Sequence, residues 1–184
     1  MRLFVSVDLP PSLTEAVAEV QAPLREAAGL TLTDPAQAHV SLKFLGETPR
    51  SRVGRIRSAI EATLDEVALD PFEATFAGVG AFPSPEYIRV VWLGVTDGGD
   101  ELTRLHESIE DRLVSQGFDP EDHEFTPHVT LARMNHAASK ALVQQYLEEQ
   151  DPSAGTTTVE EIRLTESERG EGGPVYSTVE RFPL

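Results

Sequence analysis

The chain has 184 residues, of which 40% are hydrophobic, and it carries 31 acidic and 15 basic residues for a formal net charge of −16 at pH 7. This length allows one compact unit or two small lobes that share a core. No apolar run reaches the roughly 18 residues of a membrane span, and the lack of cysteine excludes disulfides and sulfur-ligated metals. The first residues lack a signal-peptide pattern, so we expect a cytoplasmic protein.

The excess of acidic residues is the second informative feature of the composition, since only Lys43 and Lys140 are lysines. Such a charge repels itself in dilute buffer, but at molar salt the Debye length falls to about 3 Å and the repulsion largely vanishes. The composition resembles that of proteins from salt-in halophiles, and an ordinary acidic mesophile protein is the alternative. Neutralising many phosphates needs clustered Lys and Arg, so we expect any nucleic-acid substrate to be held locally.

Apolar periodicity in the first half predicts a strand, helix, strand, helix, strand series. Ser12 and Glu15 form a capping-box pattern for the first helix, and Pro23 should kink or end that helix. Thr48 and Pro49 should begin the second helix. In chain order, the expected elements are a strand at 3–8, a helix from 12 toward 29, a strand from 39, a helix over 48–64 and a strand at 72–79.

The second half repeats this order. Asp100 is the expected cap of its first helix, which Gly117 closes, and the segment 82–85 is expected to be a linker between the halves. The glycine-rich segment 168–174 is predicted to be a hairpin connection that suits a mobile loop over a site. The elements are a strand at 88–95, a helix over 100–117, a strand from 128, a helix carrying 142–147, and strands at 157–165 and 175–182. We expect one domain, 1–184, built from repeats at 1–80 and 86–184.

Two short strings occupy the same slot of this repeated series. His39 is followed by Val, Ser41 and Leu, and His128 is followed by Val, Thr130 and Leu. Because side chains on a strand alternate between faces, each histidine shares a face with the hydroxyl residue two positions on. Histidine is the side chain best suited to exchange a proton near neutral pH. The duplication therefore predicts an acid–base catalyst with two histidines.

Two basic residues near these strings are further candidates for binding a phosphate. Strict alternation places Lys43 on the face of His39, where it could help bind phosphate or could simply be a solvated strand end. The same rule places Arg133 on the face opposite His128, so Arg133 reaches the site only if the strand has ended or twisted. Neither string offers a second metal ligand on its own face, whereas zinc usually takes three or four, so we expect no metal.

The segments 39–47 and 125–133 resemble the paired His-x-Thr/Ser-x motifs of the two-histidine (2H) phosphoesterase superfamily. Their flanking residues resemble the RNA 2′,3′-cyclic phosphodiesterase family, long called 2′-5′ RNA ligases, and the similarity runs over nearly the whole chain. The resemblance implies a bilobal α/β (α+β) fold with duplicated β-α-β-α-β halves. Two mostly antiparallel sheets with pseudo-twofold symmetry would then face a central cleft.

The same resemblance implies hydrolysis of an RNA-terminal 2′,3′-cyclic phosphate to a 2′-phosphate, without metal or cofactor. It assigns His39 as proton donor and His128 as proton acceptor, with Ser41 and Thr130 donating hydrogen bonds to the phosphate. Ser41 departs from the more usual threonine but keeps the donor. The partner would be an RNA end and no membrane, the enzyme a monomer, and reverse 2′-5′ ligation a secondary activity.

Two other functions stay open at this point. One is a phosphodiesterase of small cyclic-phosphate nucleotides, because pocket width depends on loops such as 168–174. The other is a non-catalytic RNA-binding module. The acidity of the chain and its lack of closely spaced aromatic residues count against that module.

Overall fold

The structure of the protein is a computed structural model that describes all 184 residues as nine strands, four α-helices and short 3₁₀ turns. The helices are α1 (Thr14–Gln21), α2 (Val53–Val67), α3 (Gly99–Ser115) and α4 (Lys140–Glu149). The strands are β1 (Arg2–Asp8), β2 (Leu30–Leu32), β3 (His39–Glu47), β4 (Phe72–Ser84), β5 (Tyr87–Val95), β6 (His128–Met134), β7 (Ser153–Val159), β8 (Glu161–Gly170) and β9 (Gly173–Pro183).

The nine strands form one antiparallel sheet in the order β7-β4-β5-β6-β3-β1-β8-β9, with β2 attached to β6. At its centre, the two histidine strands β3 and β6 are joined by one pair of residues, Val40 and Val129. The predicted α+β class with a duplicated antiparallel arrangement is confirmed. The two predicted sheets are continuous through this single bridge.

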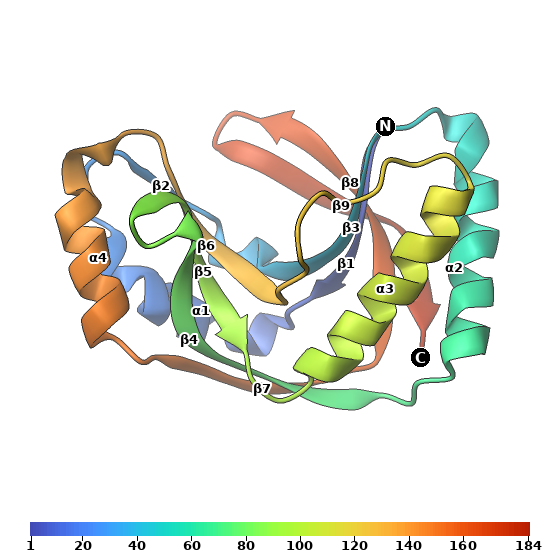
Figure 1. The fold of residues 1–184 in the computed structure, drawn as a ribbon, viewed down its shortest axis with the longest axis horizontal. Coiled ribbons are helices and arrows are strands. Elements are labelled where there is room, and N and C mark those ends of the chain that lie inside the picture. Colours follow the sequence, from blue (N-terminus) through green and yellow to red (C-terminus); the bar gives the residue numbers. More distant parts are fainter.

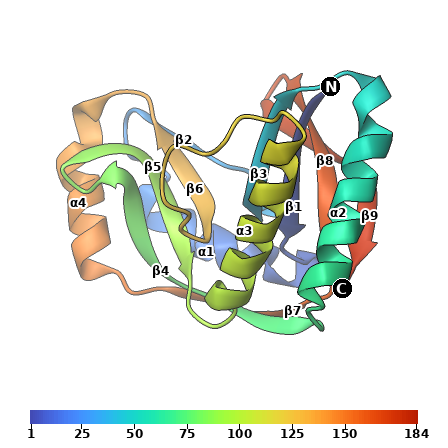
Figure 2. The same ribbon diagram turned by 45° about the vertical axis from the view of Figure 1, so that its right-hand side comes forward.

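The two halves of the molecule exchange strands. Figure 1 shows α2 and α3 together on the right with β1, β3, β8 and β9, whereas α4 lies on the left beyond β5 and β6. The rotated view in Figure 2 keeps the same grouping. Helix α3 comes from the second half of the sequence but packs against α2 and β3, and β8 pairs with β1. Each spatial half therefore combines strands from both sequence repeats.

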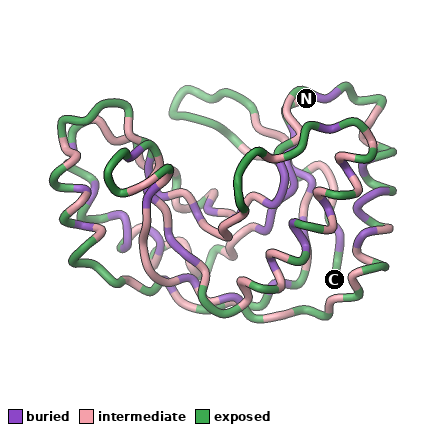
Figure 3. Tube along the Cα trace, in the orientation of Figure 1, coloured by how far each residue is buried: buried purple, intermediate pink, exposed green.

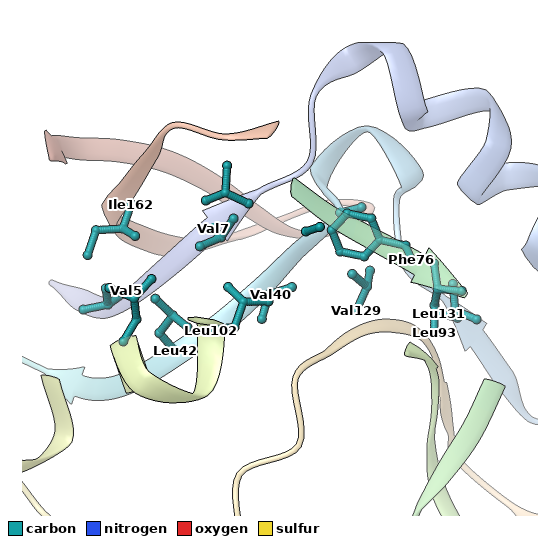
Figure 4. Packing of buried hydrophobic residues seen from close by; sticks show 14 of the residues in the cluster. Val5, Val7, Val40, Leu42, Phe76, Leu93, Leu102, Val129, Leu131 and Ile162 are labelled. Carbon is teal, nitrogen blue, oxygen red and sulfur yellow. The ribbon is translucent and has the colours of Figure 1, made fainter. Parts of the chain in front are cut away.

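The hydrophobic core crosses the bridge without interruption. Val40 and Val129 are buried and lie between two groups of apolar side chains (Figure 4). One group contains Val5, Val7, Leu42, Leu102 and Ile162, and the other contains Phe76, Leu93 and Leu131. Burial is concentrated in the central strands and the inner faces of the helices, and the tip of the β8–β9 hairpin is exposed (Figure 3). Both halves therefore share one core.

The predictions for the start and end of the first helix were only partly correct. Ser12 lies in a 3₁₀ turn, Pro11–Leu13, and α1 begins at Thr14 without a side-chain cap, so the predicted capping box does not form. Pro10 and Pro11 favour this turn, because proline fixes φ near the value of a first helical position. Pro23 lies in the 3₁₀ turn that follows the end of α1, as expected.

At α3 the observed N-cap is Gly98, with φ of 87°, rather than the predicted Asp100. Asp100 lies in the first turn, where a negative charge interacts favourably with the helix dipole. None of the helices combines the length and apolarity required to cross a membrane.

Two predicted boundaries in the strands were wrong. The expected linker 82–85 belongs to the β4–β5 hairpin, because β4 continues to Ser84 and pairs with Tyr87. The expected single strand 157–165 is two strands, β7 and β8, separated at Glu160. There the chain leaves the edge beside β4 and enters the sheet beside β1. The buried positions change phase here, from Val159 at the end of β7 to Ile162 and Leu164 in β8.

Gly80→Ala should destabilise the fold, because a Cβ at Gly80 would overlap the ring of Trp92 on the neighbouring strand. Overpacking of this kind costs about 1–3 kcal/mol in the free energy of unfolding, measured by urea denaturation. Gly54→Ala is the matched control, since Gly54 lies in α2 with nothing within 4 Å of the new methyl group. That control should be neutral or more stable by up to about 1 kcal/mol. Equal loss in both variants would contradict the Trp92 contact.

Candidate active site

The predicted catalytic and hydroxyl side chains lie together on one face of the two central strands. Val40 and Val129 pair and point into the core, so the residues on either side of each valine point to the opposite, concave face. There, the antiparallel register brings His39 toward Thr130 and Ser41 toward His128, and all four are partly exposed. Neither the Ser41 nor the Thr130 hydroxyl is engaged in a hydrogen bond within the protein, which leaves both as donors for a ligand in this cleft.

Both histidine rings are held by the same kind of backbone contact. His39 Nδ1 lies 2.9 Å from the carbonyl oxygen of Gln37, and His128 Nδ1 lies 2.6 Å from that of Thr126. A carbonyl oxygen only accepts hydrogen bonds, so Nδ1 of each ring carries hydrogen and donates it. In the neutral ring Nε2 is then the unprotonated atom. The local fold thus leaves Nε2 as the one atom of each ring free to take up and release a proton.

Aromatic rings fix the orientation of each histidine. The His39 ring meets Tyr176 edge-on, with centroids 4.9 Å apart, and His128 meets Phe82 edge-on at 4.8 Å. Phe4 and Trp92 add tilted contacts, to His39 at 5.1 Å and to His128 at 6.2 Å. Edge-to-face contact is a favourable geometry for aromatic pairs. These contacts restrict rotation of both imidazoles and shield them from water.

Burial lowers the pKa of both histidines below the ordinary value of 6.5. At His39, the hydrogen bond to Gln37 and the charge of Asp8 act in the opposite direction, and Arg133 adds to the lowering. At His128, the hydrogen bond to Thr126 opposes burial, whereas the nearby cationic groups, His39 among them, add to it. Both rings are therefore mainly neutral at pH 7 in the free protein, because burial disfavours the charged form.

A β-bulge in each histidine strand changes the face of the residues that follow. On β3, Ser6 pairs with Ser41 but Val5 pairs with Lys43, so Leu42 is an extra residue. On β6 the same irregularity falls at Leu131, three positions after the histidine as in β3. A bulge leaves two consecutive side chains on one face and shifts the alternation beyond it. The burial patterns of the two strands are accordingly the same over their first seven residues.

The bulge brings Arg133 into the cleft, contrary to the strict alternation expected from the sequence. Arg133 is exposed, and its positive charge adds to the lowering of the pKa of His39 and His128. It also opposes the rise that burial causes in the pKa of Tyr176. Its counterpart on β3 is Phe44, which is 56% exposed and packs on Phe4. One wall of the cleft thus ends in a cation and the other in an aromatic ring.

The same bulge removes Lys43 from the cleft, so its predicted place beside His39 is wrong. The Lys43 ammonium is buried and lies 2.8 Å from Glu110 on α3 and 3.7 Å from Glu121. It also donates a hydrogen bond to the carbonyl oxygen of Asp119. These contacts satisfy the buried charge and fasten the segment that leads from α3 toward His128 to the first histidine strand.

His106 provides a second link between the two motifs. It is buried, its Nδ1 donates to the carbonyl oxygen of Leu42 at 2.7 Å, and its ring stacks on Phe125 at 4.1 Å. His106 is therefore a packing residue of the core. His123 is exposed in a loop, and His136 is exposed in a turn.

Several residues of the site carried no recognised signal in the sequence. Gln37 and Thr126 each lie two positions before a histidine, and their backbone carbonyl oxygens accept the hydrogen bond from its Nδ1. Any residue has a backbone carbonyl, so the residue types at these two positions do not predict the contact. Tyr176 comes from β9, far along the chain, and no local pattern predicts its contact with His39. No group of three or more His, Asp or Glu side chains is arranged to hold a metal ion.

Comparison with known proteins identifies the family. The family model of the 2′-5′ RNA ligase superfamily matches residues 9–171. The chain belongs to the 2′-5′ RNA ligase superfamily. The RNA 2′,3′-cyclic phosphodiesterase of Archaeoglobus fulgidus is 38% identical over 184 residues, which cover 99% of each chain. That of Methanothermobacter thermautotrophicus is 34% identical and is covered over 99% of its length.

Two solved structures have the same fold as this chain. The crystal structure of TT0787 from Thermus thermophilus matches with a TM-score of 0.82 and 29% identity, over 100% of this chain and 98% of that one. The crystal structure of E. coli LigT complexed with 3′-AMP matches with a TM-score of 0.81 and 23% identity, over 100% and 97%. The similarity to LigT shows the common fold.

Lys43→Met should destabilise the protein by about 3–5 kcal/mol in urea denaturation, because it leaves Glu110 half-buried without its partner. The double variant Lys43→Met/Glu110→Gln should recover much of that loss, since neither charge then remains. A ligand role for Lys43 would give a different result: a raised KM for a phosphate substrate with little change in stability.

Proposed function

We propose that this protein hydrolyses the 2′,3′-cyclic phosphate at the end of an RNA, giving a 2′-phosphate and a free 3′-hydroxyl. The observation that carries the proposal is the pair of histidines anchored through Nδ1 on the same face of two paired strands. The choice of substrate is supported by the similar proteins of Archaeoglobus fulgidus and Methanothermobacter thermautotrophicus, which are RNA 2′,3′-cyclic phosphodiesterases. In-line displacement at phosphorus needs a proton acceptor and a proton donor on roughly opposite sides.

In the proposed reaction, Nε2 of neutral His128 takes a proton from water as the water oxygen attacks phosphorus. The bond from phosphorus to the ribose 3′ oxygen breaks, and Nε2–H of protonated His39 gives its proton to that oxygen. The proton count balances, since one proton enters at His128 and one leaves His39. Exchange with solvent restores the starting state. The Nδ1 contacts stay the same throughout, because Nδ1 carries hydrogen in the neutral and the charged ring.

The phosphate would be held by groups that the structure leaves available in the cleft. The hydroxyls of Ser41 and Thr130 can donate to the two non-bridging oxygens, one from each strand, where negative charge must be stabilised. Arg133 supplies a positive charge that no acidic side chain neutralises. In a protein with a net charge of −16, such a local cation is needed to bind an anionic substrate.

His39→Ala and His128→Ala should each lower kcat by about 10²–10⁴-fold, the usual contribution of a positioned acid or base. The assay is release of 2′-phosphate from an oligonucleotide with a 2′,3′-cyclic phosphate end, in EDTA and at high salt. His123→Ala is the control, since it removes an exposed histidine outside the cleft and should change kcat by no more than about twofold. Undiminished turnover in both cleft variants would contradict the mechanism, and inhibition by EDTA would indicate a metal.

The dependence of kcat/KM on pH should be bell-shaped with its maximum below about pH 6.5, since burial lowers the pKa of both histidines from that value. Above the higher apparent pKa both rings are neutral and no proton donor remains. Below the lower one both rings are charged and no acceptor remains. Kinetics across the titration range of histidine test this, with circular dichroism to verify folding at each pH. A maximum on the alkaline side of 6.5 would contradict the assignment.

Reverse ligation would use the same groups with a ribose 5′-hydroxyl in place of water. A monomeric cytoplasmic enzyme that works in high salt and without a metal remains our prediction. Size-exclusion chromatography and assays over a range of salt concentrations test the oligomeric state and the salt preference.

A further inference from the structure

The two histidines have matching anchors but different neighbours on the adjoining strand. In the antiparallel register, Asp8 of β1 is the partner of His39, and Gly94 of β5 is the partner of His128. Side chains of directly opposed residues lie on the same face, with Cβ atoms about 5 Å apart. One histidine therefore has a carboxylate beside it, and the other has no side chain at that place.

The carboxylate of Asp8 is fixed by donors on both oxygens. Ser6 Oγ donates to Oδ1 at 2.9 Å, and the guanidinium of Arg163 donates to Oδ2 at 2.9 Å. Ser6 is in turn 2.9 Å from the hydroxyl of Thr165, and both of these side chains are buried. A cavity of about 130 Å³ is lined by Asp8 and His39 together with Arg163. The carboxylate thus has a set position at the wall of this cavity, beside His39.

No carboxylate can take the corresponding place beside His128. A Cβ added at Gly94 would lie 2.9 Å from the carbonyl oxygen of Ala77 and 3.2 Å from the ring of Trp92. The backbone of β4 and the ring of Trp92 therefore exclude any side chain at position 94, so His128 cannot have a carboxylate beside it as His39 does.

The charged and titratable groups around His39 come from four strands. They are Asp8 from β1, Arg163 from β8, Tyr176 from β9, and Arg133 and His128 from β6. Burial is the largest influence on the pKa of both histidines and lowers it in each. Asp8 raises the pKa of His39, whereas every charged group that affects His128 lowers its pKa.

We propose that Asp8 is a positioning residue that assigns the donor role: its carboxylate stabilises the protonated ring of His39, while Gly94 leaves His128 without such a partner. In the singly protonated enzyme the proton then resides on His39 and His128 is free to act as base, before any substrate binds. The inference rests on the proposed function, because a donor is needed only for such a reaction.

Asp8→Asn tests the proposal, since the amide keeps the shape of the side chain and removes its charge. The histidine titrations are followed by NMR of ¹⁵N-labelled protein without ligand. In the wild type, His39 should titrate at a higher pH than His128. In Asp8→Asn, its midpoint should fall by about one pH unit, the lower end of the effect of a neighbouring opposite charge, and that of His128 should change little.

The same variant changes the kinetics in a way that loss of packing does not. The alkaline limb of kcat/KM should move to lower pH, so that activity above the limb falls about tenfold, while the maximum changes no more than about twofold. A variant that was only less well folded would lose activity at every pH. Because the two rings interact, the limbs are read as properties of the pair.

Glu161→Gln is the matched control. Glu161 also contacts Arg163, at 3.5 Å, so its removal likewise takes a negative charge away from that arginine. Glu161 is not among the charges that shift the pKa of His39, so the His39 titration and the kinetics of Glu161→Gln should match those of the wild type. The same change in both variants would overturn the proposal, because the cause would then be the charge of Arg163. An unchanged His39 midpoint in Asp8→Asn, or a wild type in which His128 titrates above His39, would also overturn it.

The NMR arm separates this inference from the proposed function. A wild-type protein that does not hydrolyse the cyclic phosphate would contradict the proposed function alone, while the order of the two titrations still decides the role of Asp8. Conversely, active protein with no effect of Asp8→Asn on either readout would contradict only the role of Asp8.

Discussion

The bridge between Val40 and Val129 is the constraint on which the cleft depends. It is the one residue pair that joins β3 to β6, and both valines are buried in the core shared by the two halves. Because strand side chains alternate with period two, burying these valines forces the adjacent histidines and hydroxyls onto the opposite face. A slip of one residue in this register would turn all four polar groups into the core.

A bulge at the same position of β3 and β6 then decides which later side chains point into the cleft. In a regular strand every second side chain would point into the cleft. The bulge after each motif instead turns two consecutive side chains into the core, and the residues beyond it change faces. On one strand this places Arg133 in the cleft, and on the other it sends Lys43 to Glu110 on α3. Lys43 and His106 thereby tie the first histidine strand to the segment that carries the second.

The duplicated frame supplies two histidines, which are the proton-transfer groups of the proposed reaction, and local departures from symmetry make them different. The Nδ1 anchors and the edge-on aromatic contacts are nearly the same on both sides. Other equivalent positions differ: Asp8 lies beside His39 where Gly94 lies beside His128, and β3 carries Phe44 where β6 carries Arg133. An acid–base pair needs this combination: equal access to the reacting group, so that both rings reach it, and unequal electrostatics, so that one ring is charged while the other is neutral.

The sequence by itself determined the pairing of His39-x-Ser with His128-x-Thr, the duplicated order of elements and the family, because hydrophobic periodicity and short motifs are local properties of a chain. It did not reveal the crossing at Glu160, the bulges that exchange the faces of Lys43 and Arg133, or the contacts of Asp8 and Tyr176 with His39. Those features depend on which strand edges meet and on how side chains distant in sequence fill one core. Periodicity reports which side chains alternate but carries no information about the partner strand, so only the tertiary structure decided them.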